Sequence, residues 1–165
     1  MIKEQIKTGN TVPLTDEKMR RFILSISQAV ELVLKTVILS QGGEIFVLKM
    51  PVVRIKDLID VIIEDYILKI GKDPSSIKIE IIGPRPGEKI QEELISSIEF
   101  STCYETKDMY CIYPFDYFGH ETISESKIFN GIKIIIDDNF QYSTKNTTPL
   151  SKGEIRTLIK DLNLI

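Results

Sequence analysis

Two segments of the sequence carry arginines in settings suited to binding an anion, and the first is the loop Gly-Pro-Arg-Pro-Gly-Glu-Lys at residues 83–89. Arg85 follows a predicted strand, so it can direct paired N–H donors toward a phosphate. Gly87 lets the backbone approach a ligand closely, and the flanking Pro84 and Pro86 reduce the entropy lost when the loop orders. The alternative is an ordinary surface loop in which Arg85 pairs with a nearby carboxylate.

Arg20 and Arg21 form the second segment, just ahead of a predicted helix. Cations near the start of a helix are disfavoured by the helix macrodipole, so this placement favours an anionic partner. Two solvated surface arginines are the alternative, because most arginines lie at the protein surface. Neither segment by itself decides between these interpretations.

A capping signature predicts the helix that follows these arginines. Ser25 and Gln28 have the spacing of a capping box, in which a hydroxyl accepts a hydrogen bond from a free N–H group of the first turn. Apolar residues at near-helical spacing then predict a helix over residues 27–40. Gly42 and Gly43 are expected to end it.

The remaining elements give a mixed α/β pattern. Runs of alternating or β-branched residues predict strands, and longer runs with apolar residues along one side predict helices. Strands are predicted over residues 44–48, 77–82, 108–113 and 132–136, and the second of these is expected to be half-buried. Further helices are predicted over 55–70, over 89–95 and, after a second capping box, over 151–162. Residues 115–130 are expected to be mostly loop. Without repeats or an interdomain linker, residues 1–165 are expected to form one domain of mixed α/β (α+β) class.

Composition and charge exclude several classes of function. The net charge of −3 gives no general attraction to nucleic acid, so we expect no nucleic-acid partner. No apolar run reaches the length of about 20 residues that spans a bilayer, and the first residues lack the apolar core of a signal peptide. Cys103 and Cys111 form neither a CxxC pair nor a disulfide framework, so we expect a cytoplasmic protein.

The histidine, the adjacent acids and the cysteines of the sequence do not indicate a catalytic or metal-binding site. His120 is the only histidine, and Asp116 four residues before it does not by itself make a metal site. The adjacent acids Glu64 and Asp65 are interpreted as solvated side chains of a helix face. The two cysteines have no evident base partner, so we expect idle thiols rather than nucleophiles.

Several segments occur in the order found in one known family. They include Met-Arg-Arg-Phe within residues 9–22, Ser-Gln-Ala-Val at 27–30, Gly-Gly-Glu-Ile-Phe-Val at 42–47, Arg-Pro-Gly-Glu-Lys at 85–89 with Glu-Glu-Leu at 92–94, and a tail at 142–154. Together they resemble the C-terminal half of the capsular-polysaccharide-type UDP-N-acetylglucosamine 4,6-dehydratases, which are extended short-chain dehydrogenase/reductases. The resemblance is close within residues 1–95 and looser over residues 96–165.

The resemblance implies roles for the arginines. In that family the arginines aligned with Arg21 and Arg85 contact the diphosphate of the nucleotide sugar, so both are expected to do so here. Arg20 stands where the family usually has threonine, which leaves open which arginine of the pair reaches the phosphate. The residues assigned to supporting the site are Arg20, Pro86, Gly87 and Glu88.

The resemblance also implies chemistry outside this chain. Enzymes of this class use NAD(P) as a temporary hydride store, bound on the glycine-rich turn of a Rossmann unit. The sequence contains neither that turn nor a Tyr-x-x-x-Lys pair. We therefore assign no catalytic, cofactor-binding or metal-binding residue, and expect NAD(P) only on a Rossmann domain that this chain lacks. The chain is expected not to be an enzyme by itself.

Two functions remain open. The first is a UDP-sugar-binding module of a 4,6-dehydratase, a lyase of capsule or other polysaccharide biosynthesis, either cut from a longer protein or paired with a separately encoded Rossmann domain. The second is a non-catalytic remnant or protein-interaction domain that self-associates, because loss of the cofactor domain exposes apolar surface. A standalone enzyme would need a nucleophile–base pair or metal cluster that the sequence does not show.

Overall fold

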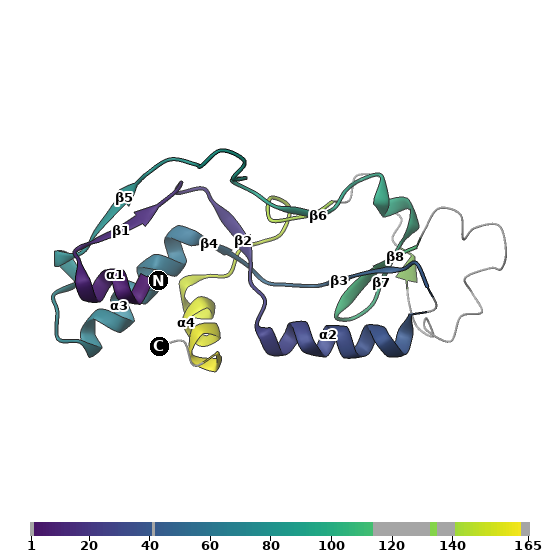
Figure 1. Cartoon of the computed structure of the whole chain (residues 1–165), viewed down its shortest axis with the longest axis horizontal. Coiled ribbons are helices and arrows are strands. Elements are labelled where there is room, and N and C mark those ends of the chain that lie inside the picture. The colour runs from purple at the N-terminus through teal and green to yellow at the C-terminus, as the bar shows by residue number, and fades with distance from the viewer. Residues whose placement is uncertain (1, 41, 114–132, 135–140, 163–165) are drawn as a thin grey trace. The chain divides into compact units, whose positions relative to one another are not determined.

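The computed structural model describes residues 2–40, 42–113, 133–134 and 141–162, which form α-helices and short strands (Figure 1). The chain divides into two compact units. The first unit comprises Met1–Ile23, Pro51–Glu92 and Thr144–Ile165, and the second comprises Leu24–Met50 and Glu93–Ser143. The predicted mixed α/β class is confirmed. That residues 1–165 form one domain stays a prediction.

The first unit combines helices with two short strand pairs. Its elements are α1 (Ile2–Thr8), β1 (Thr11–Leu14), β2 (Arg20–Phe22), β4 (Val52–Arg54), α3 (Ile55–Lys69), the 3₁₀ turn η1 (Pro74–Ser76), β5 (Lys78–Ile81) and α4 (Lys152–Asp161). β1 pairs with β5 in parallel, and β2 pairs with β4 antiparallel. The second pair places Arg20 opposite Arg54 and Arg21 opposite Val53.

α3 lies at the centre of the first unit and is covered on two faces. Ile59, Ile63 and Ile67 recur every four residues, so they share one face, and they pack against apolar side chains of α1 and β1. Val61 points to another face and packs with Ile155 of α4. The helix predicted over residues 55–70 is confirmed, and burial on two sides explains why it is apolar around much of its circumference.

The second unit is built on a small antiparallel sheet. Its elements are α2 (Ile26–Leu39), β3 (Ile45–Leu48), β6 (Glu93–Ile95), η2 (Glu99–Thr102), β7 (Cys103–Glu105), β8 (Met109–Ile112), β9 (Lys133–Ile134) and β10 (Tyr142–Ser143). The sheet order is β3-β8-β7-β9, and β6 pairs with β10. Tyr104, Cys111 and Tyr113 form a buried cluster, in which the two tyrosine rings meet edge to face with centroids 5.3 Å apart.

Both predicted capping boxes are confirmed. The Ser25 hydroxyl accepts from the Gln28 backbone N–H at 3.1 Å, and the Gln28 side-chain oxygen accepts from the Ser25 N–H at 3.0 Å. Ser151 and Glu154 repeat this exchange at the start of α4, at 3.3 and 2.8 Å. Each box satisfies two backbone donors that the first turn leaves unpaired, so it fixes where the helix begins.

The predicted helix over residues 89–95 is wrong. The Arg20 N–H donates to the Ile90 carbonyl at 3.0 Å, and the Thr144 N–H donates to the Glu92 carbonyl at 2.8 Å. The carbonyls of this segment therefore bond residues far away in the sequence rather than the next helical turn. Its last three residues form β6 by pairing with β10, so tertiary pairing overrides a local helical pattern.

The strand predictions hold better for position than for burial. β3, β5 and β8 correspond to the strands predicted at 44–48, 77–82 and 108–113, and β9 corresponds in part to the strand predicted at 132–136. The loop predicted at 115–130 lies outside the described residues. Ile77 and Ile79 pack against the core of α1, β1 and α3. That core does not extend to Ile81 and Ile82, which are 59% and 50% exposed, so this strand is less buried than predicted.

Candidate functional site

Arg21 lies in the middle of β2, with its side chain only 22% exposed. Its Nη1 donates to the carbonyl of Arg20 at 2.8 Å and to that of Ile90 at 3.4 Å. Its Nη2 lies 3.8 Å from a Glu88 oxygen, and its Nε lies 3.4 Å from a Glu92 oxygen. The guanidinium therefore lies against the end of the loop at residues 83–89 and the segment that follows it.

The Arg85 loop is exposed and shaped by two glycines. Gly83 and Gly87 have φ values of 78° and 83°, in the left-handed region that favours glycine. A Cβ added at Gly87 would meet nothing within 4 Å, so its backbone conformation, not crowding, calls for glycine. Within the described residues no carboxylate pairs with the exposed Arg85 side chain. The described residues therefore show no ion pair that would support the alternative of an ordinary surface loop.

Glu88 joins the two arginine segments. One carboxylate oxygen accepts from the Arg85 backbone N–H at 3.1 Å, while the other lies 3.8 Å from Arg21 Nη2. The Glu88 N–H donates in turn to the Arg85 carbonyl at 2.9 Å, which closes a tight turn. Two motifs far apart in the sequence are thereby brought to one place, with Pro86 and Gly87 inside the turn.

Arg20 and Arg21 have different partners, as expected for successive residues of a strand. Arg20 Nη1 donates to the carbonyls of Thr144 and Lys145 at 3.1 and 3.3 Å. Thr144 is fully buried, and its hydroxyl accepts from the Glu92 N–H at 2.9 Å. Sequence reasoning missed the structural roles of Thr144 and Glu92, although both lie inside the segments that carry the family resemblance.

A hollow of about 360 Å³ lies beside Arg20 in the first unit. It is lined by Glu17, Lys18, Arg20, Arg54 and Gln91. Arg54 was not singled out from the sequence, because only the pairing of β2 with β4 places it next to Arg20. The hollow is lined by three cationic side chains and one carboxylate, so cations predominate there although the whole chain carries a net charge of −3.

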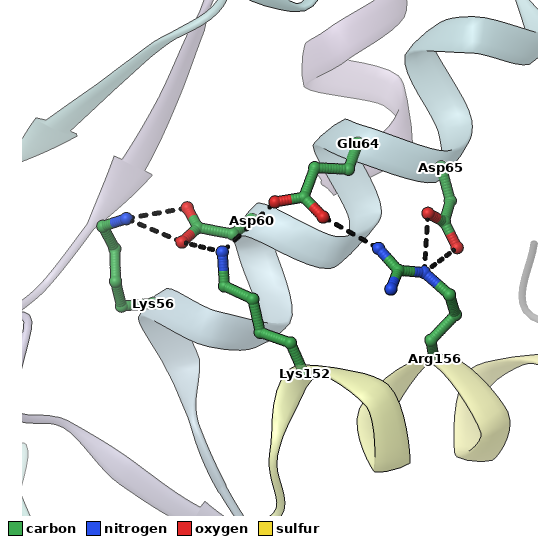
Figure 2. A network of polar contacts seen from close by, with 6 residues as sticks. All are labelled: Lys56, Asp60, Glu64, Asp65, Lys152 and Arg156. Atoms are coloured by element: carbon green, nitrogen blue, oxygen red, sulfur yellow. Dashed lines mark hydrogen bonds and ion pairs between the residues drawn. The ribbon is translucent and has the colours of Figure 1, made fainter.

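An ion-pair network joins α3 to α4, as Figure 2 shows for Lys56, Asp60, Glu64, Asp65, Lys152 and Arg156. Arg156 Nε donates to both oxygens of Asp65 at 2.9 Å, and its Nη2 donates to Glu64 at 2.8 Å. Glu64 and Asp65, expected to be solvated, are thus ion-paired. Burial would raise the pKa of Asp60, but hydrogen bonds from Lys56 and Lys152 outweigh it and lower that pKa. These acids link α3 to α4 through ion pairs.

Other candidate chemistry is weak. Burial raises the pKa of Cys103 and of Cys111 to about 12, so neither thiol is a ready nucleophile. In the part of the chain that the structure describes, no cluster of His, Cys, Asp and Glu is arranged to hold a metal ion; His120 and Asp116 lie outside it. Among the described helices, none combines the length and apolar character that a membrane span requires.

The sequence is similar to proteins of polysaccharide biosynthesis. The profile of a family described as "polysaccharide biosynthesis protein" matches residues 1–114. An uncharacterized membrane protein of Methanocaldococcus jannaschii is 45% identical over 100% of this chain and 45% of its own length. The UDP-N-acetylglucosamine 4,6-dehydratase (inverting) of Campylobacter jejuni is 33% identical over 98% of this chain and 45% of its own length. A UDP-glucose 4-epimerase of Rickettsia canadensis is 32% identical over 98% of this chain and 44% of its own length.

A solved structure shares the fold. The X-ray structure of Pen from Bacillus thuringiensis matches with a TM-score of 0.80 and 34% sequence identity, covering 99% of this chain and 45% of that chain. The present chain thus spans less than half the length of the relatives it matches.

Proposed function

The chain belongs to the family of polysaccharide biosynthesis proteins, and we propose that it binds the diphosphate of a UDP-sugar with Arg21 and Arg85. Two of the relatives described above carry the names of enzymes that act on UDP-sugars. The observation that carries the proposal is the contact of Glu88 with both arginine segments. A grip on two adjacent phosphates needs cationic groups held close together, and this contact supports such proximity.

On binding, phosphate oxygens of the ligand would replace the carboxylates of Glu88 and Glu92 as partners of Arg21. The Arg21 ion pairs with Glu88 and Glu92 are long, at 3.8 and 3.4 Å, so little is lost when a phosphate oxygen replaces a carboxylate. The Arg85 side chain is exposed, so a ligand can reach it. Each charge-assisted hydrogen bond contributes about 1.5–3 kcal/mol, and salt weakens the contribution at the exposed Arg85 most.

For the substrate we propose UDP-N-acetylglucosamine, supported by the Campylobacter relative's name and by the resemblance of the Arg85 loop to the 4,6-dehydratases. The epimerase name of the Rickettsia relative supports the same class of UDP-hexoses. We place NAD(P) and the hydride chemistry on a Rossmann domain outside this chain, which makes the present chain the C-terminal substrate-binding domain of an extended short-chain dehydrogenase/reductase. No catalytic residue is assigned here.

Isothermal titration with UDP-N-acetylglucosamine tests this function. The chain is expected to bind, and Arg85→Ala is expected to weaken binding by about tenfold or more, as the loss of one charge-assisted contact implies. Lys78→Ala is the matched control, because Lys78 is an exposed cation on β5, outside both arginine segments. Equal affinity of wild type and Arg85→Ala would overturn the role of Arg85.

A second candidate function, protein association, is supported by α2. None of its fourteen described residues is buried. Six of its apolar side chains are strongly exposed: Ile26, Val30, Val33, Leu34, Val37 and Ile38, between 52% and 85%. Exposed apolar patches of this kind mark surfaces that bind a protein partner, such as a second copy or a separate Rossmann domain.

Light scattering during gel filtration separates the two candidates. Oligomers that dissociate on Val37→Lys, together with no affinity for UDP-N-acetylglucosamine, would favour association as the function. A monomer that binds the nucleotide sugar favours the binding module.

A further inference from the structure

The hollow beside Arg20 has the features of an anion site that differs from the pair Arg21 and Arg85. We propose that the hollow lined by Lys18, Arg20 and Arg54 binds a phosphate or diphosphate group of a small molecule. The inference concerns different side chains from the proposed nucleotide-sugar contacts, and it stands if those contacts are wrong.

The register of β2 and β4 places two arginines directly opposite each other. Arg20 and Arg54 are partners in an antiparallel pair, where Cβ atoms of opposite residues lie about 4.5–5.5 Å apart on the same face. Like charges at such positions destabilise a sheet. An anion between the two guanidinium groups removes this repulsion, so the pair favours a bound anion.

The two guanidinium groups differ in how firmly they are held. Both hydrogen bonds of the Arg20 side chain use Nη1, which leaves the Nε and Nη2 donors unbonded within the described residues. Arg54 has one ion pair there, from Nε to Asp57 at 3.6 Å, and its side chain is 52% exposed. Arg20 is therefore a fixed donor and Arg54 an adjustable one, a combination that can close on a ligand.

The start of α3 adds to the positive potential. Arg54 is the residue before the helix, and its side chain makes no capping hydrogen bond. A cation at this end of a helix is disfavoured by the macrodipole, and an anion is favoured. Asp57 in the first turn of α3 offsets part of this effect through its ion pair with Arg54, whereas an anion in the hollow would offset the repulsion between Arg54 and Arg20.

The size and lining of the hollow indicate the class of ligand. A volume of about 360 Å³ admits a small molecule rather than a single ion. Lys18 is exposed and supplies a third cation, Gln91 supplies an amide, and Glu17 supplies the one carboxylate. Arginine forks match the paired oxygens of phosphate, so a phosphorylated molecule fits better than a carboxylate. Its phosphate could belong to a free phosphorylated compound or to a nucleotide sugar.

Titration of the full chain with inorganic pyrophosphate and, separately, with UDP-N-acetylglucosamine tests the hollow. Pyrophosphate is expected to bind the wild type, and Arg54→Gln is expected to weaken it by about tenfold. Lys18→Gln, which changes only an exposed side chain, is expected to weaken it less and serves if Arg54→Gln does not fold. Lys78→Gln is the matched surface control and is expected to leave the affinity unchanged.

The two ligands separate the sources of the phosphate. Loss of pyrophosphate binding alone in Arg54→Gln assigns the hollow to a free phosphorylated compound, and loss of both assigns it to the nucleotide sugar. The proposal is overturned if wild type does not bind pyrophosphate, if Arg54→Gln and Lys18→Gln both bind it as tightly as wild type, or if Lys78→Gln weakens it equally. Failure of the Arg85 proposal shows separately, as UDP-N-acetylglucosamine binding that is unchanged in Arg85→Ala.

Discussion

α2 and α3 are both apolar helices of similar length, yet among their described residues α3 has four that are buried and α2 has none. In α3 four residues are buried: Ile59, Val61, Ile63 and Ile67. Partners from α1, β1 and α4 cover two of its faces, and ion pairs tie it to α4 (Figure 2). In α2 none of the described residues is buried, and Val37 and Ile38 are 75% and 83% exposed.

The difference shows what helical periodicity can and cannot predict. Apolar spacing predicts which residues share a face, because side chains three and four positions apart lie side by side. It does not predict whether the same chain supplies the surface that covers them. We interpret the apolar face of α2 as a surface for a partner, and α3 as the stable centre of the first unit.

The largest expected effect distinguishes the buried helix from the exposed one. Ile59→Ala is expected to lower the free energy of unfolding by about 2–5 kcal/mol, because Ile59 is 1% exposed and truncation leaves a cavity. Val37→Ala on α2 is expected to change it by less than about 0.5 kcal/mol. Urea unfolding of both variants measures this. A large, concentration-dependent loss in Val37→Ala would show instead that α2 is covered by a second copy.

The two capping boxes should differ in their effect on global stability. Ser151→Ala is expected to cost about 1 kcal/mol, because α4 buries Ile155 and Ile159 against α3. Ser25→Ala removes the same bonds from α2, which has no fully buried residue among those described, so the expected result is local fraying. Hydrogen exchange should then accelerate in α2 while the urea midpoint stays the same. An equal shift of the midpoint in both variants would contradict the comparison.

The smallest effect concerns the ion pairs of α3. Asp60→Asn removes the carboxylate shared by Lys56 and Lys152 and is expected to cost about 1 kcal/mol or less at neutral pH. The folded-state pKa of Asp60 lies below its ordinary value of 3.8, so its contribution is present above that pH and is lost as pH falls through the folded-state pKa. Wild type should therefore lose more stability than the variant on acidification to pH 2–3.

A matched control for this pH dependence is Glu80→Gln. Glu80 is an exposed carboxylate on β5, outside the network. It is expected to follow the wild-type acid profile. If Asp60→Asn also follows that profile, the ion pairs of Asp60 contribute nothing to the pH dependence of stability.

Local signals in the sequence were sufficient for the helices that carry caps. Ser25 and Ser151 mark helix starts by chemistry within four residues, so no tertiary information was needed. The wrong helix at 89–95 arose where the opposite holds, since Glu92 and Ile90 bond through their carbonyls to residues far along the chain. The strands β2 and β4 were missed because each is only three residues long and exists through the other.

The candidate site was predictable only in part for the same reason. Arg21 and Arg85 follow from motifs read along the chain. The contact of Glu88 with both, and the position of Arg54 opposite Arg20, depend on pairing between distant segments. Thr144 is fully buried and forms hydrogen bonds with Arg20 and Glu92, but no local signal in the sequence distinguishes it from the threonines around it.

The most direct test of the central claim is ³¹P nuclear magnetic resonance of UDP-N-acetylglucosamine in the presence of the chain. Both phosphorus signals are expected to shift or broaden with wild type and with Val37→Ala, because α2 lies outside the proposed contacts. At the same concentrations the perturbation is expected to be much smaller with the double variant Arg21→Gln, Arg85→Ala, because both proposed diphosphate contacts are removed. Equal perturbation by wild type and the double variant would contradict the claim that these two arginines bind the diphosphate.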